Sequence, residues 1–581
     1  MLEKWFNATG IQITILLLLI VIVAGLIIFV LKFLFVYDRL LRYRERREQK
    51  KNLEKLSRKE ISELEERQKE LDYSLPENPL SGTNPVSDEK GLVSNVNVVE
   101  ELRIFPQKRR TSSFQQTVST ELKRLILFFL GTAIFWLLLG TTVGLYVGIK
   151  FVAPDVDQIS WLSFGRLRPA HTNMVFWGWA SSAMLGLAYY VIPRVSNIEN
   201  FNIKHGYISL ILVNLAVLVG TISLLAGVNN GGGEYREYIW PIMITFGIGV
   251  AISAWNFFRP VRKRKVKEVY ISNWYILSAA MFIVVVIILA YIPYWQNGVG
   301  ETIIQGYYMH QAIGMWFMLL NLGLMYYFLP QQLNKPIYSY SLGALAFWTH
   351  ILFYTLIGPH HFIFSAIPWR IQTSAIVASA GMLIPVAAGT ANFLLTFKGA
   401  WYQLKTSYTL PFYFMSIIFY FTGSFQGTVE AFRYTNLLWH FTDFTVAHSH
   451  LTMYGIITFM LWGFMYTLIP RLTGKEPPKI WVGIHFWLAL IGLLLYVTSL
   501  MIGGTQSGQG WIDKRPFIEG VINMAPYWLW RAIGGTMMWV SHLIFAYNFY
   551  IMIRKRKDID IPSTPAEILA LKKQFQKTEL K

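Results

Sequence analysis

Residues 444–470 read FTVAHSHLTMYGIITFMLWGFMYTLIP, a stretch with no aspartate, glutamate, lysine or arginine. A helix of this length rises about 40 Å at roughly 1.5 Å per residue, which exceeds the roughly 30 Å hydrocarbon core of a bilayer. The stretch therefore predicts a membrane-spanning helix. It also contains His448 and His450, and a polar ring inside a membrane is costly enough to require a partner.

The rest of the 581-residue chain continues this pattern, with 54% hydrophobic, 16% aromatic and 15% charged residues. Because lipid cannot satisfy backbone polar groups, repeated apolar runs longer than about 18 residues indicate a helical bundle rather than a barrel. We expect an all-α polytopic membrane protein. One spanning helix is expected near 11–36, and twelve more near 121–151, 171–193, 206–227, 238–258, 272–293, 306–330, 341–358, 371–397, 408–427, 444–470, 480–503 and 527–553.

The composition also suggests where the parts of the chain begin and end. Six arginine and lysine residues between positions 42 and 51 follow the first apolar run, which indicates an uncleaved anchor whose far end is cytoplasmic. The next stretch is polar, first as a charged solvent-exposed helix at 41–72 and then as a linker at 73–118. We therefore expect a transmembrane anchor at 1–37, a cytoplasmic charged helix and linker at 38–118, a twelve-helix domain at 119–556 and a cytoplasmic tail at 557–581.

Lysine and arginine also gather in alternate loops of the predicted bundle, which orients it in the membrane. The intervening loops, such as 228–237 and 504–520, are rich in glycine, asparagine and glutamine. We expect these loops and the N-terminus on the non-cytoplasmic side, and the C-terminus in the cytoplasm. The net charge of +19 is thus explained by membrane topology, and we expect no nucleic-acid partner.

The chain contains no cysteine. This excludes disulfides, thiolate metal sites, iron–sulfur clusters and the C-x-x-C-H attachment of c-type haem. Any metal must lie on histidine or oxygen ligands, and any haem must be held non-covalently.

His448 and His450 are two positions apart, so they point about 200° apart around a helix axis. They cannot chelate one metal together. A helix between two flat cofactors can instead ligate one on each side. Two hydrogen-bonded core histidines are the plain alternative.

Further histidines are expected at the same end of the bundle. His360 and His361 follow a Gly-Pro helix breaker, and His310 lies near the non-cytoplasmic end of its helix. Three imidazoles at one depth would form a metal site with an open position, and imidazole suits copper, zinc or iron. His171 begins its helix on that side, so His171 and His450 are candidates for the two axial ligands of a low-spin haem.

Four motifs, taken together in order and spacing, resemble the catalytic subunit of the cbb3-type, or C-family, haem–copper oxidases over about residues 120–555. They are GRLRP at 165–169 before His171, KPIYSY at 335–340, GPHH at 358–361, and the run from His440 through Asp443 to His448 and His450.

The resemblance implies the haem–copper oxidase twelve-helix bundle, here with one extra N-terminal transmembrane helix. It implies two haems b and one copper ion. In the family's pattern the low-spin haem falls on His171 and His450, the high-spin haem on His448, and copper on His310, His360 and His361.

Tyr354 matches the tyrosine that in this family is covalently joined to one copper ligand, which implies a link to His310. A phenol there can donate a proton and an electron when an O–O bond breaks, as dioxygen reduction requires. The resemblance therefore makes Tyr354 and His310 the expected catalytic residues. Without the resemblance, Tyr354 would be interpreted as an ordinary tyrosine at the membrane interface.

The resemblance also assigns roles to other polar residues. It places Arg433, His440 and Asp443 near the haem propionates. It places Glu234 or Glu237 at a calcium site, and oxygen ligands suit calcium. A cytoplasmic proton path is expected to include Tyr338, Ser339, Tyr340 and Asn392, although such residues also hydrogen-bond between membrane helices.

The sequence departs from the family's pattern in two places. Gln426 stands where the family usually has a glutamate near the active site, and an amide cannot titrate. Glu430, one turn further on, is a possible substitute. The segment before residue 120 has no counterpart in the usual subunit.

We therefore expect a terminal oxidase of the bacterial inner membrane that reduces dioxygen and takes up protons from the cytoplasm. Electrons would come from separate c-type cytochrome subunits or soluble cytochrome c. The alternative is a nitric oxide reductase with non-haem iron in place of copper. Tyr354 and Gln311 beside His310 favour the oxidase, whereas Gln426 keeps the reductase open. A non-redox transporter, from another class, would contain no haem.

Overall fold

The computed structural model describes residues 47, 51, 53–73, 107–108, 118–554 except 232 and 293–296, 568–570 and 572–573. The anchor expected at 1–37 lies outside these residues, as does most of the tail expected at 557–581. The chain forms two compact units. The larger unit comprises Ser119–Leu468 and Ile484–Ala546, and the smaller comprises Met1–Val118, Ile469–Gly483 and Tyr547–Lys581.

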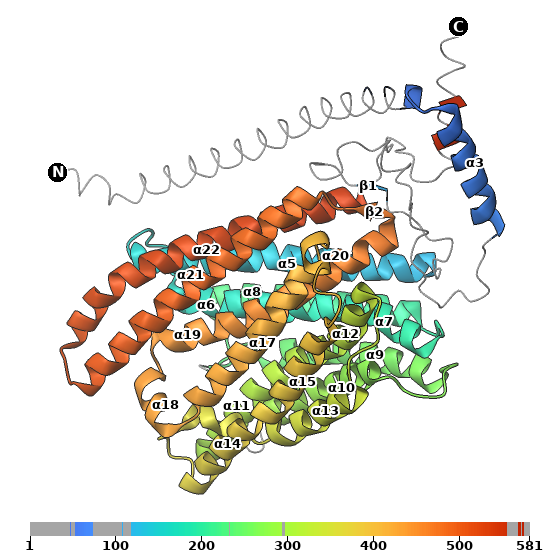
Figure 1. The fold of residues 1–581 in the computed structure, drawn as a ribbon. Helices are drawn as coiled ribbons and strands as arrows, with labels where there is room; N and C mark the ends of the chain where they lie inside the picture. The colour runs from blue at the N-terminus through green and yellow to red at the C-terminus, as the bar shows by residue number, and fades with distance from the viewer. Residues whose placement is uncertain are drawn as a thin grey trace. The chain divides into compact units, whose positions relative to one another are not determined.

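Each of the twelve helices expected after the anchor coincides with helix in the structure (Figure 1). They are α5 (Thr120–Val152), α6–η2–α7 (Phe164–Ser196), α8 (Ile203–Ala226), α9 (Trp240–Arg262), α10 (Ile271–Tyr291), α11–η4–α12 (Gly298–Leu333), α13 (Tyr340–Tyr354), α14 and α15 (Trp369–Gly381 and Leu383–Thr396), α17 (Leu410–Glu430), α19–η6–α20 (Asp443–Thr473), α21 (Lys479–Ile512) and α22 (Phe517–Ile553). Within the described part of the chain, ten spans are long and apolar enough to cross a membrane, and α13 and α17 are the two segments outside that set.

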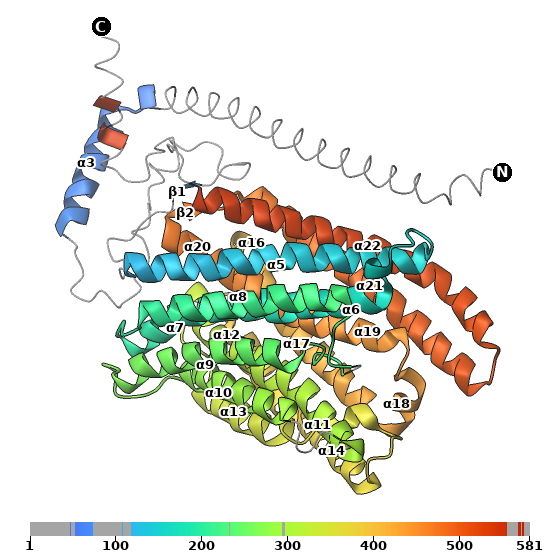
Figure 2. The same cartoon turned by 180° about the vertical axis from the view of Figure 1, so that it is seen from behind.

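Three of these segments form the inside of the larger unit. In Phe164–Ser196, Gly298–Leu333 and Asp443–Thr473, the buried share of the most apolar stretch is 94%, 89% and 94%. The other seven spans have shares of 44–56%, as expected of helices with one face toward lipid. Figure 2 shows the outer helices α8, α9 and α10 covering one side of the bundle. The three inner helices carry His171, His310, His448 and His450.

Each inner helix contains a π-helical segment that begins one to three residues after a histidine. These segments are η2 (Met174–Ala180), η4 (Ala312–Met318) and η6 (Leu451–Thr458). A π-helix bonds from i to i+5, so it inserts extra backbone into the helix and is often found at functional sites. The sequence pattern did not predict these segments, because hydrophobic periodicity at 3.6 and at 4.4 residues is hard to separate over so few residues.

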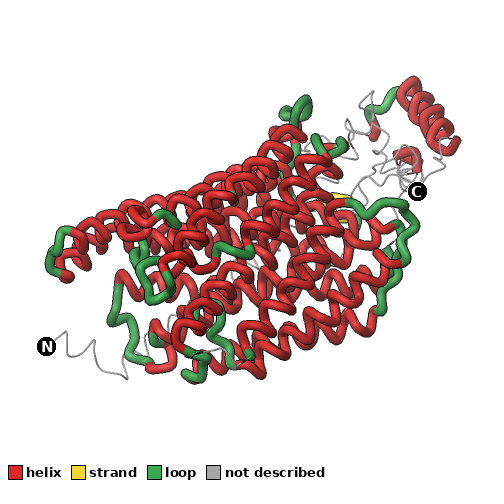
Figure 3. The backbone as a smooth tube through the Cα atoms, turned by 90° about the horizontal axis from the view of Figure 1, so that it is seen from below, coloured by secondary structure: helices red, strands yellow, loops and turns green. Residues whose placement is uncertain are grey.

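Two predicted boundaries were wrong. The helix of His171 begins at Phe164, so this histidine lies inside the helix rather than at its start. The loop expected at 504–520 is mostly helical, because α21 continues to Ile512 and α22 begins at Phe517. Glycine at 492 and 534 lets the two helices approach closely. Figure 3 shows that helix occupies most of the described backbone.

The smaller unit contains α3 (Arg58–Tyr73) and a two-stranded antiparallel sheet. Gln107 of β1 (Gln107–Lys108) pairs with Glu476 of β2 (Lys475–Glu476). The charged helix expected at 41–72 was predicted to be exposed to solvent, but the described segment 53–73 buries Leu53 and Leu64 against Ile568 of the C-terminal tail. These leucines are the apolar positions that the charge-based prediction overlooked.

Candidate functional site

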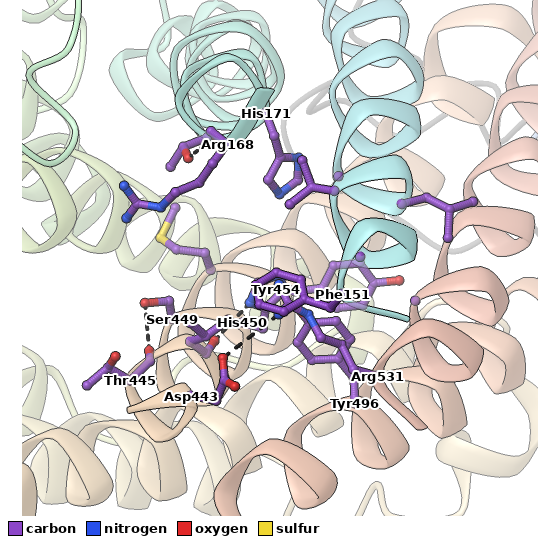
Figure 4. A pocket seen from close by; sticks show the side chains of 18 of the residues that line it. Phe151, Arg168, His171, Asp443, Thr445, Ser449, His450, Tyr454, Tyr496 and Arg531 are labelled. Carbon is purple, nitrogen blue, oxygen red and sulfur yellow. Dashed lines mark hydrogen bonds and ion pairs between the residues drawn. The ribbon is translucent and has the colours of Figure 1, made fainter. Parts of the chain in front are cut away.

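A large cavity in the larger unit, the first cavity, has a volume of about 500 Å³ and a mainly apolar lining. His171 of α6 and His450 of α19 (Asp443–His450) enter it from opposite sides (Figure 4). Cofactor pockets generally have volumes of roughly 300–1,000 Å³. The cavity therefore has the size and the pair of imidazoles that a haem with two axial histidines needs.

Both histidines have the same hydrogen-bond arrangement. His171 Nδ1 lies 2.7 Å from the Gly140 carbonyl oxygen, and His450 Nδ1 lies 2.8 Å from the Val446 carbonyl oxygen. A carbonyl only accepts, so each Nδ1 carries the hydrogen and each Nε2 keeps its lone pair. This is the arrangement expected of iron-binding histidine. A Cβ at Gly144 would overlap the His171 ring, so glycine makes room for it.

The second cavity, also about 500 Å³, contains His448 and the predicted metal ligands. His448 and His450 therefore face different cavities across α19, as their spacing predicted. Thr445, Val446, Ser449 and Met453 line both cavities, so this helix forms the wall between them.

His310, His360 and His361 come together in the second cavity, with ligand atoms all within 4.8 Å of one another. They come from the end of α11 (Gly298–Gln311) and from η5 (Gly358–Phe362), a 3₁₀ turn after Tyr354. His310 Nε2 and His360 Nε2 lie only 2.6 Å apart. Adjacent histidines can share one centre here because the Gly-Pro breaker ends the preceding helix. A set of three imidazoles fits copper.

A hydrogen bond behind the cluster fixes the His360 ring. Its Nδ1 lies 2.6 Å from Ser379 Oγ, which itself donates to the Ala375 carbonyl at 2.7 Å. Ser379 therefore accepts from Nδ1, and Nε2 faces the cluster with its lone pair. His310 Nδ1 is buried without a hydrogen-bond partner. This orphaned nitrogen and the facing imidazoles are what a metal-binding cluster would show.

Tyr354 ends α13 beside this cluster. Its ring and that of His310 have centroids 5.3 Å apart, in an edge-on arrangement. Gln311 Nε2 donates to the Tyr354 carbonyl at 2.7 Å, and a Cβ at Gly314 would overlap the tyrosine ring. His350, which the sequence analysis did not select, stacks on Tyr354 with centroids 4.8 Å apart. The i, i+4 spacing of His350 and Tyr354 was the available signal.

Gln426 contacts the proposed iron ligand His448. The amide Oε1 accepts from His448 Nδ1 at 3.0 Å, and the amide nitrogen points to Met501 Sδ at 3.4 Å. Glu430 Oε1 lies 3.6 Å from the same Nδ1 and is buried without a hydrogen-bond partner. The neutral amide is thus the closer partner of His448, and the carboxylate is the more distant one.

The residues assigned to the haem propionates divide into two groups. Asp443 lines the first cavity and accepts from Trp528 Nε1 at 2.8 Å, while His440 lines the second. Arg433 lines neither, because its guanidinium stacks 3.8 Å from the Trp369 ring centre. Burial lowers the pKa of His440.

Arg531, which the sequence analysis did not select, lines the first cavity (Figure 4). It is 7% exposed, and its Nε donates to Tyr496 Oη at 3.1 Å. Its Nη1 is buried without a hydrogen bond and lies 3.8 Å from Asp443. A buried guanidinium with one nitrogen left without a hydrogen bond beside this cavity fits an anionic substituent of a bound cofactor.

The two glutamates of the expected calcium site have different partners, and Glu237 Oε1 is buried without a hydrogen bond. Glu234 is paired with Arg168 at 2.6 Å, and Glu237 accepts from Asn173 at 3.0 Å, with burial raising its pKa. Among the described residues, the histidine cluster is the only metal-like group of three or more such side chains. Calcium prefers about six to eight oxygen ligands, far more than this pair offers.

Two of the four residues expected in a proton path contact each other. Asn392 is fully buried; its side chain accepts from the Ser339 backbone N–H and donates to the Ser339 carbonyl, both at 2.8 Å. Its amide also reaches Tyr326 Oη at 3.5 Å, deeper in the bundle. Tyr338 and Tyr340 are instead 53% and 41% exposed. Asn392 and Ser339 therefore meet, while the two tyrosines lie at the surface.

The fold and its two histidine-lined cavities define a polytopic membrane protein suited to bind haem and a further metal. Sequence comparison agrees. The family model for cytochrome c and quinol oxidase polypeptide I matches residues 124–537. The chain therefore belongs to this family, which implies haem and copper as its cofactors.

Individual relatives refine the relationship. The chain is 32% identical to the cbb3-type cytochrome c oxidase subunit CcoN1 of Stutzerimonas stutzeri over 443 residues, which are 73% of this chain and 93% of that one. It is 30% identical to a cytochrome c oxidase subunit 1 homolog of Agrobacterium tumefaciens over 475 residues, which are 77% and 85% of the two chains. These similarities confirm the family predicted from the motifs.

A solved structure shares the fold. A heme-copper terminal oxidase dimer, determined by cryo-electron microscopy, superposes with a TM-score of 0.64 at 15% sequence identity, covering 77% of this chain and 87% of that one. The predicted all-α polytopic architecture is thereby confirmed.

Proposed function

We propose that this chain is the subunit of a terminal respiratory oxidase that reduces dioxygen to water, with electrons from cytochrome c. The observation that supports this best is the pair of cavities on the two sides of α19, with three further histidines in the cavity of His448. Two cofactor sites on one helix suit electron transfer between them, and an imidazole cluster in the second suits reaction with a small molecule.

In this proposal His171 and His450 hold a low-spin haem b, and His448 holds a high-spin haem b. The three clustered histidines hold copper. When bound, these groups supply electron transfer and dioxygen binding. The chain's own residues orient the ligands through Gly140, Val446 and Ser379, which accept from Nδ1 and so leave Nε2 free to bind.

Tyr354 is proposed to supply a proton from its hydroxyl at the second cavity. It lines this cavity beside His310, and Gln311 and Gly314 fix its position. Protons would arrive from the cytoplasm past Ser339, Asn392 and Tyr326. This supply would couple the reaction to proton uptake and translocation.

In the proposed orientation the chain spans a bacterial inner membrane with its C-terminus on the cytoplasmic side. The basic loops lie at the same ends of the helices as the C-terminus, and basic loops are typical of the cytoplasmic side. With no C-x-x-C-H motif, the chain must receive electrons from separate c-type cytochromes. The 1–37 anchor, the 38–118 segment, the 119–556 domain and the 557–581 tail remain our proposed division.

Nitric oxide reduction is the second candidate, and one observation bears on it. Among the described residues, two acidic side chains line the second cavity, those of Glu234 and Glu430. Glu430 lies beside His448. No carboxylate joins the described histidine cluster. Because a non-haem iron site would use nearby carboxylate ligands, the cluster favours copper.

Metal analysis of purified protein, together with dioxygen and nitric oxide turnover, tests the proposal. We expect one copper and two haem irons per chain, and oxygen uptake that Tyr354→Phe abolishes. Stoichiometric non-haem iron without oxygen uptake would select the reductase. A colourless protein would select the transporter, whereas loss of high-spin haem absorbance on His448→Ala would exclude it.

A further inference from the structure

His542 of α22 is a buried histidine with no role in the proposed function. It is 1% exposed and lines the first cavity together with Thr141 of α5 and Tyr454 of η6. Both of its ring nitrogens have partners. Nδ1 lies 3.0 Å from Thr141 Oγ1, and Nε2 lies 3.1 Å from Tyr454 Oη.

The hydrogen on the Thr141 side can be assigned. Thr141 Oγ1 lies 2.7 Å from the Leu137 carbonyl oxygen, which can only accept, so the threonine hydrogen points there. Toward His542, Thr141 is therefore an acceptor. It follows that Nδ1 carries a hydrogen whether the ring is neutral or charged.

The Tyr454 side can change its direction. Tyr454 Oη has a second neighbour, Ser541 Oγ at 3.5 Å, and Ser541 donates its own hydrogen to the Met538 carbonyl at 2.6 Å. When His542 is neutral, Tyr454 donates to Nε2. When Nε2 also carries a hydrogen, it donates to Tyr454, which turns its hydrogen toward Ser541. No polar atom loses its partner in either state.

The surroundings of His542 leave such a charge without a fixed counter-ion. Its titratable neighbours among the described residues are Tyr454, His171 of α6, and His485 of α21 across the Trp462 ring. His485 in turn contacts Tyr466 Oη through Nδ1 at 3.0 Å. None of these neighbours is a carboxylate. A proton on His542 would therefore be stabilised by a negative charge that appears in the cavity itself.

We propose that His542 is a proton-accepting site coupled to reduction of the cofactor in the first cavity. The proposal rests on the proposed haem between His171 and His450. One electron from the donor cytochrome adds one negative charge there, and one proton from water binds Nε2 of His542; reoxidation releases both. Within low-dielectric surroundings, an added charge at about 10 Å changes proton affinity by roughly tenfold.

The test is a redox titration of the low-spin haem in the purified holoenzyme at several pH values. We expect the wild-type midpoint potential to fall with rising pH and His542→Gln to flatten this dependence. Gln can replace both hydrogen bonds but cannot take up a proton. Proton uptake on anaerobic reduction, followed with a pH-sensitive dye, should decrease in the same variant.

A second pair of variants addresses the redirected hydrogen bond. Ser541→Ala removes the acceptor that Tyr454 needs only when His542 is charged, so the charged form becomes less stable. We expect a roughly tenfold loss of proton affinity at His542. The pH range over which the midpoint potential changes should therefore move down by about one unit. Ser499→Ala is the matched control. Ser499 is also buried and donates to a backbone carbonyl, that of Tyr496 at 2.9 Å, but it has no tyrosine hydroxyl as a partner. We expect it to behave as wild type.

The outcomes separate the two proposals. An absent low-spin haem spectrum in the wild type overturns the proposed function. A normal spectrum with an unchanged pH dependence in His542→Gln overturns the role of His542 alone. If His542→Gln does not assemble, the comparison of Ser541→Ala with Ser499→Ala tests the role of His542. The same pH dependence of the midpoint potential in these two variants counts against the proposal.

Discussion

Gln426→Glu should lower the midpoint potential of the high-spin haem. The substitution places a carboxylate where an amide oxygen now accepts from His448 Nδ1 at 3.0 Å. A negative charge stabilises the oxidised iron, and a stronger acceptor makes the imidazole a more basic ligand. The new charge would be about 7 Å from an iron on Nε2. With an effective dielectric constant of about 20, the interaction is about 2.4 kcal/mol, or about 100 mV for one electron.

The assay is a spectroelectrochemical titration of the purified protein, with resonance Raman measurement of the iron–histidine stretch in the reduced state. We expect a fall of about 100 mV and a higher stretching frequency. The low-spin haem of the same variant is the internal control, because His450 faces the other cavity. An unchanged potential and frequency at both neutral and alkaline pH would refute the reasoning, since alkaline pH would ionise a carboxyl taken up in its neutral form.

Three further substitutions test the second cavity and the first. Gly314→Ala should displace the Tyr354 ring that its Cβ would overlap, with oxygen uptake falling at least about tenfold and the low-spin spectrum unchanged; full activity would mean that the ring position is not critical. Ser379→Ala removes the acceptor of His360 Nδ1, so copper affinity measured by chelator competition should fall about 10–100-fold, and equal affinity would contradict our assignment. Arg531→Leu should lower the low-spin haem potential by removing a positive charge, whereas Arg531→Lys should retain most of it; a redox titration in which the two variants agree would count against the assignment.

The features of the fold that depend on composition and residue spacing could be predicted from the sequence. Apolar runs located twelve helical segments of the described chain, ten of which are long and apolar enough to span a membrane, since lipid requires long helices. The spacing of His448 and His450 predicted two separate cavities, because helix geometry alone places such residues on opposite sides. Motif order then predicted the family, which the relatives confirm.

Other features depend on contacts between distant segments, which spacing does not encode. Arg531 is 81 positions from His450, and nothing local marks it as a neighbour of the same cavity. The resemblance assigned Arg433 instead, but tertiary packing holds that guanidinium over Trp369. The loop at 504–520 was misjudged for a different reason. Its glycines suggest a turn in isolation, whereas in the structure Gly504 and Gly508 let neighbouring segments pack closely against the helix.

The π-helical segments make the inner helices sensitive to chain length rather than to side-chain identity. One residue turns an α-helix by about 100°, so deleting a single residue from η2 would rotate His171 away from its cavity while the later part of the helix kept its packing. The same holds for η4 with His310 and for η6 with His450. A one-residue deletion here would therefore rotate one part of the helix relative to the other. It would abolish cofactor binding at one site and leave a folded, membrane-inserted protein.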